Sequence, residues 1–225
     1  MVQDTTKYPY CAVGRLVTKS IAGDKIMSCT ATLVGRRHII AASHCATWGN
    51  FRDDSPPINP LIFHPGYNQK QIYKPARVIY TYWLRKLDES RNYPDDYSGD
   101  WLVGVLDRYV DTTNGQFGQQ LYDHRWTGDD SWNMIGYPND FIPAGGVQVF
   151  QGPLAIQAVE DTPYGEVYKL DAVGKQGDSG GPIYGIFQGL PKLIGTTALA
   201  LDFTVKVHGG LPMFGLIAKA IAEYP

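Results

Sequence analysis

The sequence predicts an all-β fold. Short runs of β-branched and aromatic residues alternate along the chain with Gly, Pro, Asn and Asp, a pattern typical of strands joined by turns. The chain has 225 residues, a length that β-sandwiches and β-barrels commonly reach as one unit, and its hydrophobic content of 44% is ample for a packed core. Only the C-terminal end shows helical spacing.

Strands are expected at residues 12–17, 30–34, 38–42 and 147–150. The second and third of these flank Gly35-Arg36-Arg37, so we expect them to form a hairpin. Near the C-terminus, apolar residues recur at spacings of three and four and form one apolar face, which predicts a helix. These residues are Met213, Phe214, Ile217, Ala220 and Ile221, and Pro212 suits the first turn of that helix.

Two long loops and a linker are expected between these elements. Residues 48–60 and 88–99 have the composition of loops, and the stretch 111–120 is polar and nearly free of aliphatic residues. Because this stretch lies near the middle of the chain, we expect it to join two β subdomains. They span residues 1–112 and 113–225 and together form one domain.

Composition and charge exclude several classes of protein. The net charge is −2 without long runs of one sign, which gives no electrostatic case for binding nucleic acid or an anionic membrane. No apolar stretch approaches the roughly 20 residues that span a bilayer. Residues 1–4 carry neither the basic nor the apolar region of a secretion signal, so we expect an intracellular protein or a mature domain whose leader has been removed.

The three cysteines are Cys11, Cys29 and Cys45. An odd number leaves at least one thiol outside any intramolecular disulfide. Without a CxxC pair or a fourth ligand nearby, neither a structural zinc site nor another metal or cofactor is expected. One disulfide and one further thiol is the simplest interpretation, with Cys11 either buried or linked to another molecule.

The strongest chemical signal is Gly177-Asp178-Ser179-Gly180-Gly181-Pro182. A serine nucleophile needs its oxygen exposed on a tight turn, with backbone N–H groups directed at the developing oxyanion. Glycines beside the serine permit such a turn and let a substrate approach the backbone. The same string is also ordinary turn chemistry, so by itself it leaves a plain surface turn open.

A candidate base follows an apolar strand in Ala41-Ala42-Ser43-His44-Cys45. A bridge from Cys29 to Cys45 would close the hairpin around His44 and fix the imidazole. The alternative is a core histidine between two buried thiols, but its occurrence together with the serine motif favours the catalytic interpretation.

The acid expected to orient this imidazole is Asp100, at the head of the apolar run 101–106. Burial of that strand would place Asp100 at the edge of the core, within reach of His44. Asp95 and Asp96 lie in a polar loop and Asp107 at the far end of the strand, so we expect these three to face solvent or turns.

His44, Asp100 and Ser179, in this order, resemble the three motifs of the trypsin/chymotrypsin family. The spacing of Cys29 and Cys45 resembles the histidine-loop disulfide of that family. Within the family the chain is most similar to the V8-like glutamyl endopeptidases, through residues 5–10, 28–30, 135–138 and 168–170.

The resemblance implies two six-stranded antiparallel barrels with the site in the cleft between them, and a C-terminal helix. It implies a secreted, monomeric serine endopeptidase that acts on proteins or peptides without a cofactor. Ser179 would be the nucleophile, His44 the base, Asp100 its partner, and the N–H groups of Gly177 and Ser179 the oxyanion hole. The alternatives are a catalytically silent binding or toxin-like protein on the same scaffold, and an intracellular quality-control protease or hydrolase of the same chemistry, against which a Cys29–Cys45 disulfide would argue.

Three residues bear on substrate choice through the same resemblance. Trypsin-like enzymes carry an aspartate where this chain has Val173, so cleavage after Arg or Lys is not expected. Glutamyl endopeptidases use a histidine where this chain has Thr197. His208 could approach the pocket from the next strand, although by itself it suits a surface turn. Glutamate and apolar side chains both remain open.

Asp178 is the residue at which the resemblance to trypsin-like enzymes fails. In those enzymes an Ile-Val-Gly-Gly terminus pairs with the aspartate before the nucleophile, and no such sequence precedes residues 8–10 here. Asp178 therefore needs either a different terminus or local hydrogen bonds, because an unpaired buried carboxylate is costly.

Overall fold

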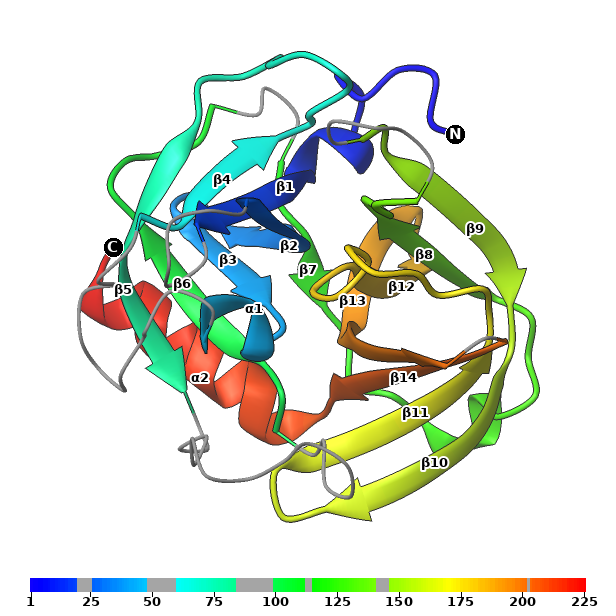
Figure 1. Ribbon diagram of the computed structural model, residues 1–225. Helices are drawn as coiled ribbons and strands as arrows, with labels where there is room; N and C mark the ends of the chain where they lie inside the picture. Colours follow the sequence, from blue (N-terminus) through cyan, green and yellow to red (C-terminus); the bar gives the residue numbers. More distant parts are fainter. Residues whose placement is uncertain (20–25, 48–59, 84–98, 112–114, 141–145, 202) are drawn as a thin grey trace.

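The structure, a computed structural model, describes residues 1–19, 26–47, 60–83, 99–111, 115–140, 146–201 and 203–225 (Figure 1). The expected loops 48–60 and 88–99 lie almost entirely outside these residues, as do Asp95 and Asp96 and residues 112–114 of the expected linker. Strands make up nearly all of the regular secondary structure among the described residues, and the main helix is at the C-terminus. The expected all-β class is confirmed.

The first half of the chain forms a closed antiparallel barrel of six strands in the order β1-β2-β3-β6-β5-β4. The elements of this half are η1 (Tyr10–Ala12), β1 (Val13–Lys19), β2 (Ile26–Gly35), β3 (His38–Ala41), α1 (His44–Thr47), β4 (Ile62–Pro65), β5 (Ala76–Trp83) and β6 (Leu102–Leu106). The hairpin expected across Gly35-Arg36-Arg37 is the β2–β3 connection. Every residue of β3 and β6 is buried, which explains why these two strands read as continuous apolar runs.

The second half forms a curved sheet in the order β10-β11-β14-β13-β12-β8-β9, with β7 beside β13 in parallel. Its elements are β7 (Gly118–Gln119), η2 (His124–Trp126), β8 (Trp132–Gly136), β9 (Val149–Leu154), β10 (Ile156–Thr162), β11 (Gly165–Asp171), β12 (Pro182–Phe187), β13 (Leu190–Leu201), β14 (Thr204–Gly209) and α2 (Leu211–Glu223).

The end strands of this sheet, β9 and β10, are separated only by Ala155. Taken as one strand bent at this residue, they close the sheet on itself and give the second half six main strands (Figure 1). The expected double barrel is therefore confirmed, and the bend and the short β7 are features that the sequence pattern did not predict.

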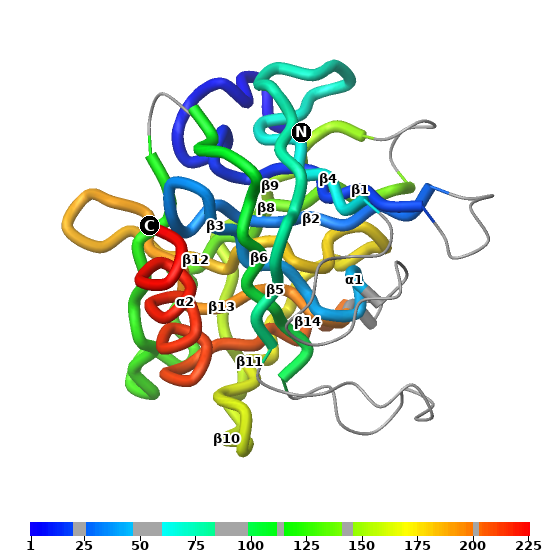
Figure 2. Tube along the Cα trace, turned by 90° about the vertical axis from the view of Figure 1, so that its left-hand side faces the viewer, coloured from blue at the N-terminus to red at the C-terminus, as the bar shows by residue number. Residues whose placement is uncertain are grey.

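Helix α2 follows the second sheet and packs against β3, β5 and β6 of the first barrel, while it also contacts β11 and β14 (Figures 1 and 2). Its buried residues are Met213, Phe214, Ile217 and Ala220, four of the five expected, while Ile221 is 36% exposed at the edge of the face. Pro212 lies in the first turn, as expected, where its missing N–H has no intrahelical acceptor to lose. By covering β3 and β6 from outside, α2 accounts for their burial on both faces.

The N-terminal segment, which precedes the first barrel, contacts both halves of the chain. The N–H of Val2 donates to the carbonyl of Gln148 at 2.9 Å, and the hydroxyl of Thr5 donates to the carbonyl of Gly66 at 2.6 Å. These partners lie in the second and first halves respectively, so the two halves are held together by both ends of the chain. A continuous apolar cluster also joins the first barrel to residues of the second half, such as Tyr137 and Leu193.

Among the described residues, no helix has both the length and the apolar character needed to cross a membrane.

Candidate active site

Ser179 lies in the tight turn between β11 and β12, with glycines on both sides. Gly177 and Gly180 have φ angles of 101° and 89°, a region that residues with a Cβ rarely adopt. A Cβ at Gly180 would lie 2.0 Å from the carbonyl oxygen of Thr30, so the turn approaches the first barrel too closely for any other residue. Ser179 itself is partly exposed between the buried Asp178 and Gly180.

Strand β2 of the first barrel holds this turn mainly through Thr30. Its N–H donates to the carbonyl of Ser179 at 2.9 Å, and its hydroxyl donates to the carbonyl of Gly177 at 2.7 Å. The same hydroxyl accepts the N–H of Tyr137 at 2.9 Å. Thr30 is fully buried, so each of these bonds forms away from water.

Strand β13 holds the other side of the turn. The N–H of Gly180 donates to the carbonyl of Thr197 at 2.6 Å, and the N–H of Thr197 donates to the carbonyl of Gly181 at 2.8 Å. The serine turn is thus fixed between strands of the two halves.

His44 and Asp100 form a close pair. His44 Nδ1 lies 2.6 Å from Asp100 Oδ2, while the N–H of His44 and the hydroxyl of Ser43 both donate to Asp100 Oδ1, at 2.9 and 2.6 Å. The Asp100 side chain is 2% exposed and the His44 side chain 19%. The sequence therefore identified a real pair, although the contribution of Ser43 was not foreseen.

The disulfide Cys29–Cys45 forms, as the resemblance implies. It joins β2 to the residue after His44, and Cys45 Sγ lies 3.9 Å from the carbonyl oxygen of Ser179. Because Cys45 is adjacent to His44, this contact brings the histidine helix α1 against the serine turn. Cys11 is a fully buried free thiol, and burial raises its pKa to about 11.

Electrostatics favour the charged form of both members of the pair. Burial alone would raise the pKa of Asp100, but the charge of His44 and the hydrogen bonds from His44 and Ser43 outweigh it and lower this pKa to about 2. Burial likewise opposes protonation of His44, yet the carboxylate of Asp100 raises the pKa of the imidazole above its usual 6.5. An imidazole held in this way is suited to accept a proton and stay beside its counter-charge.

His208 lies behind Asp100 rather than at the surface. Its side chain is 1% exposed, and Nδ1 accepts the backbone N–H of Asp100 at 3.2 Å. The expectation that this histidine suits a surface turn is wrong, because β14 pairs on both edges, with β11 and β13, and buries it. No sequence signal linked His208 to Asp100.

The peptide bond between Gln176 and Gly177 has a defined direction. The carbonyl of Gln176 accepts the N–H of Asn139 at 2.7 Å. Because the C=O and N–H of a trans peptide point in opposite directions, the N–H of Gly177 is turned away from Asn139. The sequence predicts that the N–H of Gly177 donates to the oxyanion. An N–H turned away from Asn139 is compatible with that role.

Asp178 is satisfied locally. The N–H of Lys175 donates to Oδ2 at 2.9 Å, and the side chain is 2% exposed. Of the two alternatives left by the sequence, the described contacts favour local hydrogen bonds. Burial raises the pKa of this carboxyl to about 7, despite the lowering effect of the Lys175 hydrogen bond.

Val173 and Thr197, two of the residues expected to govern substrate choice, have uncharged side chains. Val173 is 44% exposed, and its backbone is bonded on both sides to the side chain of Gln151 on β9. Thr197 is 1% exposed, and its hydroxyl has no hydrogen-bond partner among the described residues. Neither position places a positive or negative group near the serine turn.

Among the described residues, Cys29, His44 and Cys45 are close enough to resemble a metal cluster. The two sulfur atoms are bonded to each other, so they are not thiolates and cannot serve as ligands.

Solved structures of proteases superpose on nearly the whole chain. A Glu endopeptidase in complex with MPD gives a TM-score of 0.68 at 17% identity, covering 98% of this chain and 95% of its own. Protease Anisep from Arthrobacter nicotinovorans gives 0.65 at 16%, covering 94% and 96%. The thermostable serine protease AL20 from an extremophilic microorganism gives 0.64 at 15%, covering 93% and 96%. No model of a known protein family matches the sequence, and no curated protein does.

The chain has the serine-protease fold. This is the chymotrypsin-like double barrel expected from the sequence motifs. In this serine-protease fold, the first barrel supplies His44 and Asp100 and the second supplies Ser179. The junction between the barrels is where Thr30 and the disulfide bring them together.

Proposed function

We propose that the protein is a serine endopeptidase with Ser179 as nucleophile, His44 as general base and Asp100 as the residue that orients the base. The observation that carries this proposal is the buried Asp100–His44 hydrogen bond, beside a serine turn that contacts the neighbouring Cys45. The similarity of the fold to solved proteases supports protein or peptide substrates.

The reaction proceeds through an acyl-enzyme. Ser179 Oγ forms a bond to the scissile carbonyl carbon, its proton moves to His44, and the carbonyl electron pair moves onto oxygen. The C–N bond then breaks as His44 returns the proton to the leaving amine. Water repeats the sequence and releases the acid, while Asp100 stays ionised throughout, as its lowered pKa favours.

The backbone of the turn would supply the oxyanion hole. We propose the N–H groups of Gly177 and Ser179 as its donors, and the engagement of the Gln176 carbonyl by Asn139 supports this because it fixes the direction of the Gly177 N–H. Loss of one such donor typically costs about 10²–10³-fold in rate.

We propose that the side chain before the cleaved bond is uncharged and apolar. Val173 and Thr197 offer no charge to a substrate, and His208, the remaining candidate to recognise glutamate, accepts a hydrogen bond from Asp100. A digest of a peptide library would test this: cleavage after Leu, Phe or Ala is expected, and predominant cleavage after Glu, Arg or Lys would contradict it.

Labelling with a fluorophosphonate, followed by intact mass, tests the activity itself. We expect one adduct on the parent protein, none on Ser179→Ala and strongly slowed labelling of His44→Ala. The absence of any adduct on folded, disulfide-bonded protein would contradict an active enzyme and favour the second candidate, a silent binding protein on the same scaffold.

The disulfide also bears on where the protein works. Disulfides persist mainly in oxidising compartments, so Cys29–Cys45 supports a secreted, extracellular protein. We propose a monomer, since the complete proposed triad comes from one chain.

A further inference from the structure

Away from the serine turn, three potential metal ligands converge at the end of the β10–β11 hairpin. His124 comes from η2, Asp161 from β10 and Glu166 from β11, and their ligand atoms all lie within 4.8 Å of one another. His124 Nε2 and Glu166 Oε1 are 3.2 Å apart. One imidazole nitrogen with two carboxylate oxygens is a donor set that Zn²⁺ takes readily, whereas Ca²⁺ and Mg²⁺ prefer oxygen ligands alone.

The separations suit a tetrahedral ion. Bonds of about 2.0–2.1 Å from zinc to nitrogen and oxygen place neighbouring ligand atoms about 3.3 Å apart. The contact between His124 and Glu166 already has this spacing. His124 and Asp161 are exposed, so closing on an ion requires rotation of side chains and no movement of the sheet.

Glu166 is oriented from behind. The hydroxyl of Tyr168 donates to Glu166 Oε2, which leaves Oε1 as the oxygen that faces His124. A hydrogen bond to the non-ligating oxygen is the kind of contact that positions carboxylate ligands in metal sites. Tyr168 is fully buried, so this support is rigid.

Two carboxylates face each other across the hairpin at this point. Asp161 and Glu166 are direct cross-strand partners, an arrangement in which like charges destabilise a sheet. A divalent cation bound between the two carboxylates would offset their repulsion.

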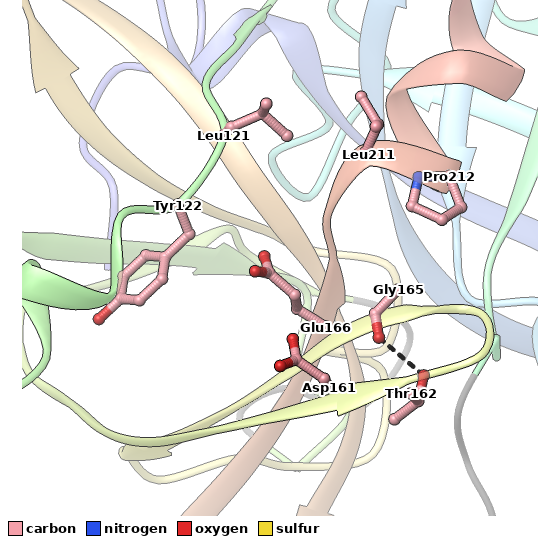
Figure 3. A pocket seen from close by; sticks show the side chains of 8 residues that line it. All are labelled: Leu121, Tyr122, Asp161, Thr162, Gly165, Glu166, Leu211 and Pro212. Atoms are coloured by element: carbon pink, nitrogen blue, oxygen red, sulfur yellow. Dashed lines mark hydrogen bonds between the residues drawn. The ribbon is translucent and has the colours of Figure 1, made fainter.

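Space for further ligands lies beside the two carboxylates. Figure 3 shows Asp161 and Glu166 side by side, pointing into a pocket of about 330 Å³. Tyr122 bounds it on one side and Leu211 and Pro212 on the other. A water molecule in this pocket can complete a fourth coordination position, and the opening gives the ion a path of entry.

We propose that His124, Asp161 and Glu166 bind one Zn²⁺ ion, with water as the fourth ligand. The ion joins the tip of the β10–β11 hairpin to the segment between β7 and β8. The site shares no residue with the proposed triad, so its role is structural, and zinc binding is independent of peptide hydrolysis.

Titration of metal-free protein with Zn²⁺ by calorimetry tests the proposal, in a Ser179→Ala background that prevents self-digestion. We expect one ion per chain with micromolar or tighter affinity, weakened at least tenfold in both His124→Ala and Glu166→Gln. Glu160→Gln, which removes one charge from the neighbouring position of the same hairpin, is the matched control and should bind as the parent does.

Cobalt substitution gives a second measurement, because tetrahedral Co²⁺ absorbs strongly in the visible region and octahedral Co²⁺ weakly. The strong band is expected in the parent and lost in His124→Ala, a change at a side chain that is 56% exposed. Zinc binding that His124→Ala and Glu166→Gln leave unchanged would place the ion at another histidine and overturn the proposal. So would the absence of micromolar binding, or a preference for Ca²⁺ that survives His124→Ala.

Discussion

The hydroxyl of Thr30 donates a 2.7 Å hydrogen bond to the carbonyl of Gly177, although the two residues are 147 positions apart in the chain. Through this bond a strand of the first barrel determines the geometry of a turn in the second. The same hydroxyl accepts the N–H of Tyr137, so one buried oxygen connects three segments. The proposed oxyanion hole therefore depends on a residue outside the proposed triad.

Replacing Thr30 by valine is expected to slow fluorophosphonate labelling about tenfold or more. The change keeps the shape of the side chain but leaves the Gly177 carbonyl and the Tyr137 N–H without their partner, which costs about 1–3 kcal/mol when the groups are buried. Urea unfolding measures the loss of stability, and the rate of fluorophosphonate labelling measures the effect on the reactivity of Ser179. Thr32→Val is the matched control, because the Thr32 hydroxyl is equally buried and makes only a 3.4 Å contact to Gly180. Equal effects of the two changes would contradict a specific role for Thr30.

Gly177→Ala is expected to lower the labelling rate by about 10²-fold or more, the usual effect of losing an oxyanion donor. The new Cβ would lie 2.3 Å from the carbonyl of Tyr137, at a φ of 101°, so the backbone must move. Gly128→Ala separates this clash from φ strain, because Gly128 has a φ of 91° and nothing within 4 Å of the added carbon. Labelling of folded Gly177→Ala at the parent rate would show that Gly177 is not a donor.

The rate of acylation should fall as the solution becomes acidic. His44 must be neutral to accept the Ser179 proton, and Asp100 raises the pKa of His44 above 6.5. Activity is therefore expected to increase with pH through a midpoint above 6.5. The pH dependence of labelling, or of kcat/KM once a substrate is known, measures this midpoint. Asp100→Asn should shift it downward while slowing the reaction, and an unchanged midpoint would contradict the pairing.

Asp178 should make the protein less stable as the pH rises. Its pKa of about 7 exceeds the ordinary 3.8, so the folded state holds a proton that the unfolded state releases. The contribution of this proton to the free energy of unfolding is fully present below about pH 4 and is lost as the pH rises from about 4 to 7. Its size is on the order of 4 kcal/mol. Asp178→Asn, neutral at every pH, is expected to gain stability relative to the parent between pH 5 and 8 in urea unfolding. A constant difference between the two proteins would contradict a protonated Asp178.

Cysteine chemistry gives a prediction that needs no assay of activity. Without reductant, the unfolded protein should show one reactive thiol and the native protein almost none, because Cys11 is buried and its pKa is about 11. Replacing Cys29 and Cys45 together by serine should cost about 3 kcal/mol in the chain-entropy model. Cys11→Ala, the control, should abolish the remaining thiol and keep the disulfide. Three reactive thiols in the unfolded parent would exclude the disulfide.

The sequence predicted the parts of the fold whose patterns are local. The apolar run 38–42, the hairpin after Gly35 and the spacing of Met213 and Ile217 each depend on neighbours within one element. The joining of β9 and β10 into one bent strand was not predicted, since it depends on which strands each part meets across the sheet. The position of α2 against the opposite barrel is likewise a tertiary feature.

The candidate site divides in the same way. His44 and Asp100 were found because each ends or begins an apolar strand and because their order matches a known pattern. His208 and Thr30 were not assigned to the places they hold, since an imidazole or hydroxyl bonded to backbone 108 or 147 positions away leaves no mark in the local sequence. His208 is placed by the pairing of β14 with β11 and β13. Thr30 is placed by the pairing of β2 with β1 and β3.

The ends of the chain lie on opposite barrels: residues before β1 reach Gln148, and α2 covers β3 and β6. Each barrel is thus partly covered by a segment that belongs to the other half of the chain. Because each half depends on a segment of the other, we expect the two fragments left by a single cut between β6 and β7 to stay associated. The contact between Cys45 and the carbonyl oxygen of Ser179 should persist in such a nicked molecule. We therefore expect cleavage of the connecting segment to leave the proposed site aligned.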